Sequence, residues 1–279
     1  MQDAPIVLSV GRLEAVKAHE TMLRAFARLG DEGVDLFMTD STNADVPGFT
    51  ISERDLAPAI EEVFRTAPRR IIVSSFASHV HRIQQVIDAA HHHGRKVAFV
   101  GRSMVRNMGI ARDLGYLTIP DGLVVNLKEI KNLPDNKITL VSTGSQGEPM
   151  AALARMASGT HKHIKIRAGD TVILSSKIIP GNEKAIATII NGLYRLGADV
   201  VYEKIAPVHV SGHGYQEELK LMINLTRPRF VIPVHGEYRH LVLHARLAQE
   251  IGIPAERTLV AENGQVIEFE NRAGRLHGS

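Results

Sequence analysis

Short apolar runs of strand length alternate along most of the chain with amphipathic stretches of helical length, and this alternation restricts the fold more than any other feature. It is the signature of βαβ units, in which parallel strands are joined by crossover helices. The pattern therefore predicts an α/β fold with a parallel, doubly wound sheet. Strands are expected at Ile6–Val10, Val34–Thr39, Arg70–Ser75, Lys96–Val100, Lys137–Ser142, Thr171–Ser175, Val200–Lys204, Phe230–Val234 and Thr258–Ala261. Helices are expected at Lys17–Leu29, Glu53–Arg65, Ser78–His93, Met104–Leu114, Glu148–Met156, Glu183–Leu196, Gln216–Leu225 and Tyr238–Ile251.

The composition excludes several classes of protein. The 279 residues include no cysteine, which rules out disulfide scaffolds, cysteine nucleophiles and thiolate metal sites. Any metal must be held by His, Asp or Glu, and histidine is abundant, with 14 copies. No apolar run approaches the ~20 residues that cross a membrane, and no signal peptide opens the chain, so a cytoplasmic location is expected. A net charge of +3 permits a polyanionic partner without requiring one.

Four polar clusters follow predicted strands, at the sheet edge where α/β proteins bind ligands. They are Asp40–Asn43, Ser142–Glu148, His209–His213 and His235–Glu237. The Ser142–Glu148 turn opens a helix with small residues, so it is interpreted either as a phosphate-binding turn or, with equal weight, as an ordinary helix cap.

The other clusters suggest metal and proton chemistry. His209 and His213, with Ser211 between them, place two imidazoles and a hydroxyl close together, a group that can grip phosphate or transfer a proton. His235 follows a strand and a proline, which suits a metal ligand on a stiff support. Asp40 could bridge cations through both carboxylate oxygens.

Other basic residues favour plainer interpretations. His91–His93 end a predicted helix, where cations meet the helix dipole, so a solvated cap is expected. His240 and His244 are spaced i, i+4 but lack the glutamate of a His-Glu-x-x-His helix, so a metal role is disfavoured. Arg102 and Arg106 at a helix start are interpreted as phosphate contacts or as surface ion-pair partners.

Several of these motifs together resemble a known family. They are Asp40–Ala44, Ser75–Ser78, Gly101–Met104, Ser142–Pro149, His209–His213 and Pro233–Glu237. In this order, and from about Ala25 to Phe269, they resemble bacterial ribonuclease J, in the β-CASP branch of the metallo-β-lactamase-fold nucleases. The resemblance implies an α/β fold with a β-CASP domain, a parallel sheet flanked by helices, inserted in a partial metallo-β-lactamase αββα domain. The β-CASP domain is expected at residues 49–207, and the partial domain at residues 25–48 and 208–279.

The resemblance also implies roles for individual residues. Asp40 would bridge two zinc ions, His235 would be a late zinc ligand, and His213 would handle the scissile phosphate. Phosphate-binding residues would be Ser145, His209, Ser211, Gly212 and His213. The implied reaction is zinc-dependent hydrolysis of RNA phosphodiesters, 5′-to-3′ or internal, on single-stranded RNA that preferably carries a 5′-monophosphate. Another copy of the chain or another ribonuclease would be the protein partner.

The sequence departs from the family in its metal ligands. The family's His-x-His-x-Asp-His motif does not occur, and only His19 lies upstream of Asp40. Since each zinc needs three or more protein ligands, Asp40 and His235 alone cannot hold a zinc pair. The C-terminal stretch Asn271–Ser279 looks cut rather than finished. We therefore expect a partial copy with impaired catalysis. The alternative function is a non-catalytic RNA-binding or subunit-interaction module.

Residues 1–24 resemble a different family. Pro5–Glu20 is similar to the nucleotide-sugar segment of GT-B glycosyltransferases, in which an Arg and a Lys meet the diphosphate. Arg12 and Lys17 match that pair, whereas Ala18 replaces the usual glycine. Because so short a segment cannot supply that activity, residues 1–24 are interpreted as a foreign strand and helix.

Overall fold

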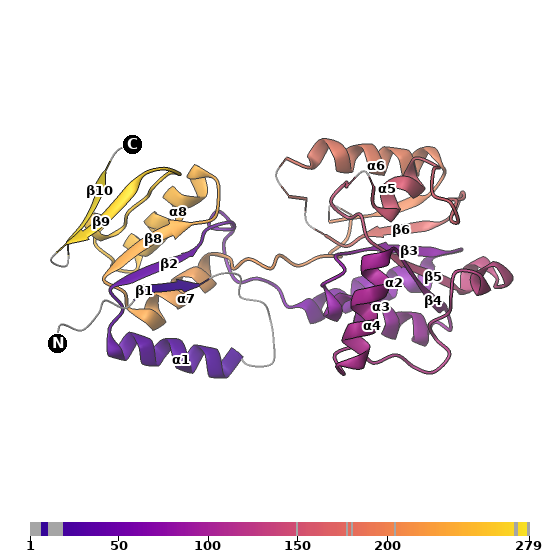
Figure 1. Cartoon of the computed structure of the whole chain (residues 1–279), viewed down its shortest axis with the longest axis horizontal. Coiled ribbons are helices and arrows are strands. Elements are labelled where there is room, and N and C mark those ends of the chain that lie inside the picture. The colour runs from indigo at the N-terminus through magenta and orange to yellow at the C-terminus, as the bar shows by residue number, and fades with distance from the viewer. Residues whose placement is uncertain are drawn as a thin grey trace. The chain divides into compact units, whose positions relative to one another are not determined.

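The computed structural model divides the chain into two compact units (Figure 1). The first unit comprises residues 1–50 and 211–279, and the second comprises residues 51–210. The structure describes residues 7–10, 19–148, 150–176, 178–179, 181–203, 205–270 and 273–277. Arg12, Lys17 and Ala18, on which the glycosyltransferase resemblance depends, lie outside the described residues.

The first unit contains a three-stranded parallel sheet in the order β1-β2-β8 and a separate antiparallel hairpin, β9-β10. Its strands are β1 (Val7–Val10), β2 (Leu36–Asp40), β8 (Phe230–Val234), β9 (Val266–Glu270) and β10 (Ala273–His277). Its helices are α1 (His19–Glu32), α7 (Gln216–Thr226), α8 (Tyr238–Glu250) and the short 3-10 helix η4 (Ala255–Arg257).

The two faces of this sheet are buried against different elements. Successive strand residues point to opposite faces, and Phe37 and Val231 accordingly pack with residues of α7 and α8. Leu36, Phe230 and Ile232 pack on the other face, with Leu259 and Ile267 among their partners. The sheet is therefore a middle layer, and its position fixes where the ends of β2 and β8 emerge.

The second unit is built on a five-stranded parallel sheet in the order β4-β5-β3-β6-β7. Its strands are β3 (Ile71–Ser74), β4 (Lys96–Val100), β5 (Ile138–Ser142), β6 (Thr171–Leu174) and β7 (Asp199–Val201). Its α-helices are α2 (Ala57–Thr66), α3 (Val80–His92), α4 (Arg102–Asp113), α5 (Ala152–Ala157) and α6 (Glu183–Arg195), and its 3-10 helices are η1 (Glu53–Leu56), η2 (Glu129–Asn132) and η3 (Asp135–Lys137).

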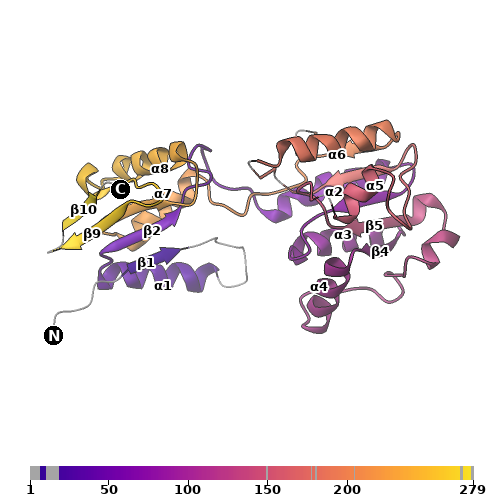
Figure 2. The same ribbon diagram turned by 45° about the horizontal axis from the view of Figure 1, so that its top comes forward.

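Helices cover both faces of the five-stranded sheet, as Figure 2 shows. Ile71 and Val73 pack in a core with residues of α2, α3 and α4, whereas Ile72 packs in a second core with residues of α5 and α6. The continuous apolar run of β3 follows from this double burial, which is typical of parallel sheets.

The predicted α/β fold, with parallel sheets flanked by helices, is confirmed, although the strands form two parallel sheets. The strand expected at Thr258–Ala261 is wrong: only an isolated bridge joins Thr258 to Val231, after the turn of η4. The helix expected from Glu148 begins at Ala152. The hairpin strand β10 was not predicted, because its sequence is poor in apolar residues. Among the described residues, no helix is long and apolar enough to cross a membrane.

The buried ion pair between Arg70 and Asp170 gives a stability prediction. Asp170 is completely buried and accepts hydrogen bonds from Arg70 Nε at 3.0 Å and from the Arg167 backbone N–H at 2.8 Å. Asp170→Ala leaves the Arg70 charge without this partner, so we expect a loss of about 3–5 kcal/mol in the free energy of unfolding. Urea denaturation of Asp170→Ala and of the unmodified chain measures this difference in the free energy of unfolding. The matched control is Glu62→Ala, which removes an exposed pair with Arg65 and should leave stability unchanged within error. A loss for Asp170→Ala no greater than for this control would contradict the prediction.

Candidate metal and phosphate site

The parallel pairing of β2 and β8 brings Asp40 and His235 to one sheet edge. Asp40 is the last residue of β2 and lies opposite Val234, the last residue of β8. His235 follows directly, and its Nδ1 lies 3.2 Å from Asp40 Oδ1. The sequence predicted both residues as metal ligands at strand ends, and the structure places them together.

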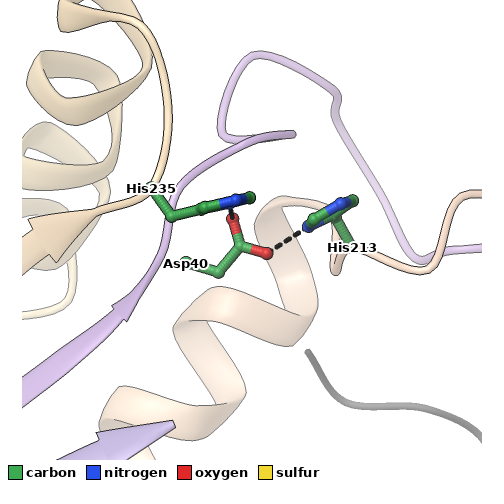
Figure 3. Close-up of side chains that lie close together, drawn as sticks. All are labelled: Asp40, His213 and His235. Atoms are coloured by element: carbon green, nitrogen blue, oxygen red, sulfur yellow. Dashed lines mark hydrogen bonds and ion pairs between the residues drawn. The ribbon is translucent and has the colours of Figure 1, made fainter. Parts of the chain in front are cut away.

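His213 completes a cluster of three ligand groups, shown in Figure 3. Its Nδ1 is hydrogen-bonded to Asp40 Oδ2, on the opposite side of the carboxylate from His235. The two imidazole rings are stacked, with centroids 5.4 Å apart and an interplanar angle of 18°. One ligand atom from each residue lies within 4.8 Å of the other two. His213, predicted from the resemblance to handle the scissile phosphate, thus lies beside the two predicted metal ligands.

The carboxylate of Asp40 is held in its charged form. Its Oδ1 accepts hydrogen bonds from the Thr42 backbone N–H at 2.8 Å and the Thr42 hydroxyl at 2.7 Å. Burial on its own would raise the pKa of Asp40, but the hydrogen bonds from His213 and Thr42 outweigh it and hold that pKa well below its usual range. Asp40 is thus a permanent anion at the centre of the cluster.

The turn after β8 is fixed by backbone contacts with the turn after β2. His235 has a φ of +55°, which is uncommon for a residue with a side chain. Its carbonyl oxygen accepts a hydrogen bond from the Ser41 backbone N–H at 3.3 Å and lies 3.1 Å from the Thr42 hydroxyl oxygen. These contacts offset the cost of the strained backbone and orient the imidazole, which is itself largely exposed.

Asn43 orients the turn that carries the predicted phosphate-binding residues Ser211 and Gly212. Its side-chain amide donates to Ser211 Oγ and to the His213 carbonyl oxygen, both at 2.8 Å. Ser211 Oγ also accepts from the His213 backbone N–H at 3.2 Å. The position of His213 therefore depends on Asn43, whose amide role the sequence did not reveal.

His244, for which the sequence disfavoured a metal role, contacts the residue next to Asp40. It is completely buried in α8, and its Nδ1 lies 2.9 Å from the Ser41 hydroxyl. It thereby ties α8 to the residue next to Asp40. His240, its i, i+4 neighbour, instead accepts a hydrogen bond from the Glu237 backbone N–H and pairs with Asp45. The two histidines thus contact different partners. The sequence feature that distinguishes His244 from His240 is the small residue Ser41 directly after β2, whose hydroxyl contacts His244.

The predicted phosphate pocket divides between the two units. Ser211, Gly212 and His213 belong to the first unit, and Ser145 and His209 to the second. Ser145 is buried in the turn after β5 and lines a cavity of about 260 Å³. The other lining residues are Ser75, Phe76, Ala77, Ser103, Thr143, Gly144, Glu148 and Ala151. The His209 ring packs edge-on against His79, with centroids 6.2 Å apart. The assembly of these residues into one pocket stays a prediction.

The donor set of the cluster fits a zinc ion. Catalytic zinc sites use three nitrogen or oxygen ligands from the protein and leave one position open. Asp40 and His235 provide one carboxylate and one imidazole, and His213 lies close enough to add a second imidazole. The hydrogen bonds from Thr42 to Asp40 are the outer contacts that orient ligands in metal sites. Around Asp40, the described residues provide ligands for one ion.

Comparisons with known proteins find two matching families and several similar relatives. The family described as "Ribonuclease J, beta-CASP domain" matches residues 68–193, and the family described as "Zn-dependent metallo-hydrolase RNA specificity domain" matches residues 197–257. Ribonuclease J of Mycolicibacterium smegmatis is 50% identical over 259 residues, which cover 93% of this chain and 46% of the relative. Ribonuclease J of Thermus thermophilus is 51% identical over 244 residues, covering 88% and 42%. That of Helicobacter pylori is 44% identical over 248 residues, covering 89% and 36%.

The five-stranded parallel unit and these matches identify a β-CASP domain in the second unit. The chain belongs to the ribonuclease J family. It spans less than half the length of the three relatives described above.

The burial of His244 predicts a pH dependence of stability. Burial lowers the pKa of His244 from 6.5 to about 4, while the charge of Asp40 acts in the opposite direction. Between these two values the unfolded chain binds a proton that the folded chain does not, so stability is lost as the pH falls from 6.5 to about 4. His244→Asn, which keeps a polar group near Ser41, should flatten this part of the profile. Urea unfolding at about pH 7.5 and about pH 5 measures it. Exposed His91→Asn is the control and should keep the slope. An unchanged slope in His244→Asn would refute the assignment.

Proposed function

We propose that this chain takes part in RNA processing of the ribonuclease J type, which is the metal-dependent hydrolysis of phosphodiester bonds in RNA. The observation that supports this most strongly is the cluster of Asp40, His213 and His235 in a chain of the ribonuclease J family. The relatives bear the name of a ribonuclease, and one matching family is described as an RNA specificity domain.

The residues of the cluster suit this chemistry. Zinc held by Asp40 and His235, when bound, would supply a Lewis acid and lower the pKa of a bound water. Asp40 contributes a fixed negative charge to hold the cation. The turn of Ser211 and Gly212 would offer a hydroxyl and backbone N–H groups to phosphate oxygens.

His213 has two possible uses, and they lead to different expectations. With Nδ1 engaged by Asp40, its Nε2 can hold a proton for the leaving oxygen of the scissile phosphate. In the other arrangement, His213 rotates to become the third metal ligand, since its ring already lies within ligand distance. We favour the first use, in which Asp40 orients the imidazole and zinc would be held by Asp40 and His235 alone. Because two protein ligands are fewer than the three of a catalytic zinc site, the ion would then be bound weakly.

The alternative function is a non-catalytic RNA-binding or subunit-interaction module. The described residues around Asp40 provide ligands for one cation, whereas the family resemblance implies two zinc ions. RNA would then be bound through the phosphate-binding residues and through Arg102 and Arg106 at the start of α4. A cytoplasmic location, and assembly with another copy or another ribonuclease, stay predictions from the resemblance.

The zinc content of the cluster and the role of His213 can be tested together. We expect the chain to bind no more than one zinc ion at Asp40, measured by titration with ZnCl2 and elemental analysis after dialysis. Asp40→Ala and His235→Ala should each weaken this binding about tenfold or more. His213→Ala should leave zinc affinity nearly unchanged while abolishing any zinc-dependent cleavage of a labelled RNA.

Two zinc ions lost together in Asp40→Ala would contradict the single-ion geometry. Loss of zinc affinity in His213→Ala would show that His213 is a ligand. Zinc binding and RNA binding without cleavage would favour the alternative function.

RNA binding should depend on salt and on the 5′ end. Contacts to phosphates release counterions, so affinity for single-stranded RNA should fall steeply as salt rises. A charged hydrogen bond contributes about 1.5–3 kcal/mol, so 5′-monophosphorylated RNA should bind about tenfold more tightly than 5′-hydroxyl RNA of the same sequence. Competition binding measures the ratio. The double variant His209→Ala with Ser211→Ala should reduce the ratio to about one, while Arg102→Ala should weaken both RNAs equally. Equal affinity in the unmodified chain would reject the phosphate pocket.

A further inference from the structure

A second group of metal-binding side chains lies in the second unit, between α2 and α3. Glu61 of α2 faces His92, the last residue of α3, and His93, which caps that helix. His93 Nε2 lies 2.7 Å from Glu61 Oε2, and His92 Nδ1 lies 3.3 Å from the same oxygen. One ligand atom from each residue lies within 4.8 Å of the other two. The sequence predicted only a solvated helix cap here.

All three ligand atoms are close enough together to reach one ion after a small movement. Zinc bonds to nitrogen and oxygen are about 2.0–2.2 Å, so ligand atoms in a tetrahedral site stand about 3.4 Å apart. The two measured separations, 2.7 and 3.3 Å, are both shorter than this value, so Glu61 and His93 would move apart to admit an ion, whereas Glu61 and His92 are already close to the required spacing. One carboxylate and two imidazoles form the His₂Glu ligand set known for zinc.

The helix end and a ring contact hold one of the three side chains, His93, in place. The end of α3 is closed by hydrogen bonds from the Gly94 N–H to the His91 carbonyl and from the Arg95 N–H to the Ala90 carbonyl. The His93 ring packs against Phe64 of α2, with centroids 6.2 Å apart. Glu61 is on the same helix, one turn before Phe64. His93 is therefore oriented by its contact with Phe64, and the more exposed His92 ring lies beside it, with centroids 4.9 Å apart.

Negative charge near Glu61, His92 and His93 favours the binding of a cation, although one nearby lysine opposes it. The C-terminal end of α3 carries the negative end of the helix dipole, and the Glu61 carboxylate adds a full negative charge. Lys137 opposes them, because its ammonium group lies 3.5 Å from the His93 carbonyl oxygen. The open coordination positions and this positive charge indicate a site weaker than a closed structural zinc site.

We propose that Glu61, His92 and His93 form a binding site for a divalent transition-metal ion of the zinc type, separate from the cluster at Asp40. The bound ion would clip α2 to the end of α3. Mg²⁺ would not bind, since imidazole nitrogen is a poor ligand for it.

The test uses the full chain in a background of Asp40→Ala with His235→Ala, which removes the first cluster. ZnCl2 alone is titrated by calorimetry, and the Tm is measured with and without ZnCl2 or MgCl2. We expect one zinc ion to bind and to raise the Tm, and MgCl2 to have no such effect. Outer-sphere partners alone change metal affinity by about 10–100-fold, so His92→Ala and Glu61→Gln should each weaken zinc binding at least about tenfold. His91→Ala, which alters the neighbouring exposed histidine, should change the affinity less than about twofold.

The outcomes separate this site from the proposed function. His92 is exposed, so its variant should fold normally, and Glu61→Gln keeps the size of the side chain. Equal zinc affinity in these variants and in their parent, or no zinc binding in that parent, would overturn the proposal. Loss of affinity in His91→Ala equal to that in His92→Ala would overturn it too, because it would indicate unspecific binding to the histidine run. Neither result depends on whether the cluster at Asp40 binds zinc or cleaves RNA.

Discussion

The parallel pairing of β2 with β8 is the constraint on which the site at Asp40 depends. The register sets Asp40 opposite Val234, so that His235, the next residue, emerges beside the carboxylate. A slip by one residue would send alternate side chains to the opposite faces of the sheet. It would take the completely buried side chains of Phe37 and Val231 away from their partners on α7 and α8. The apolar core therefore selects the register, and the register in turn places the polar groups.

The charge of Asp40 is maintained by its immediate neighbours in sequence. Thr42 supplies two hydrogen bonds to one carboxylate oxygen, while its hydroxyl also lies close to the His235 carbonyl. One small polar residue thus connects both sides of the site. Asn43 extends this arrangement to the turn of Ser211 and His213 through its amide. The run Asp40–Asn43 works as a unit because its residues follow a strand whose direction the core has fixed.

The sequence predicted the parts of this structure that follow from periodicity and strand ends. The parallel strands have apolar runs long enough to recognise, and ligands such as Asp40 and His235 stand directly after them. His213 was recognised from a motif, but its contact with Asp40 crosses 173 positions of the chain. No local pattern reports such a separation. His244 was missed because a buried histidine is distinguished from an exposed one only by what packs against it. The strand expected at Thr258 failed for a similar reason, since an apolar run after a proline turn packs beneath the sheet with only one bridge to it.

In the second unit, a buried charge holds the segment that contains His209. Arg82 of α3 is completely buried, and it donates to the Val208 carbonyl oxygen and to Ser175 Oγ, and it pairs with Glu53. Burial would raise the pKa of Glu53, but hydrogen bonds and charges from His79 and Arg82 lower it to about 2, so the pair stays ionised. A buried pair of this kind contributes little net stability, because desolvation of the ions offsets their attraction. Its effect is on geometry. The guanidinium fixes Val208, the residue before His209, and Glu53 binds His79, which packs against the His209 ring. The imidazole predicted to meet phosphate is therefore positioned from both its backbone and its ring by one charged network.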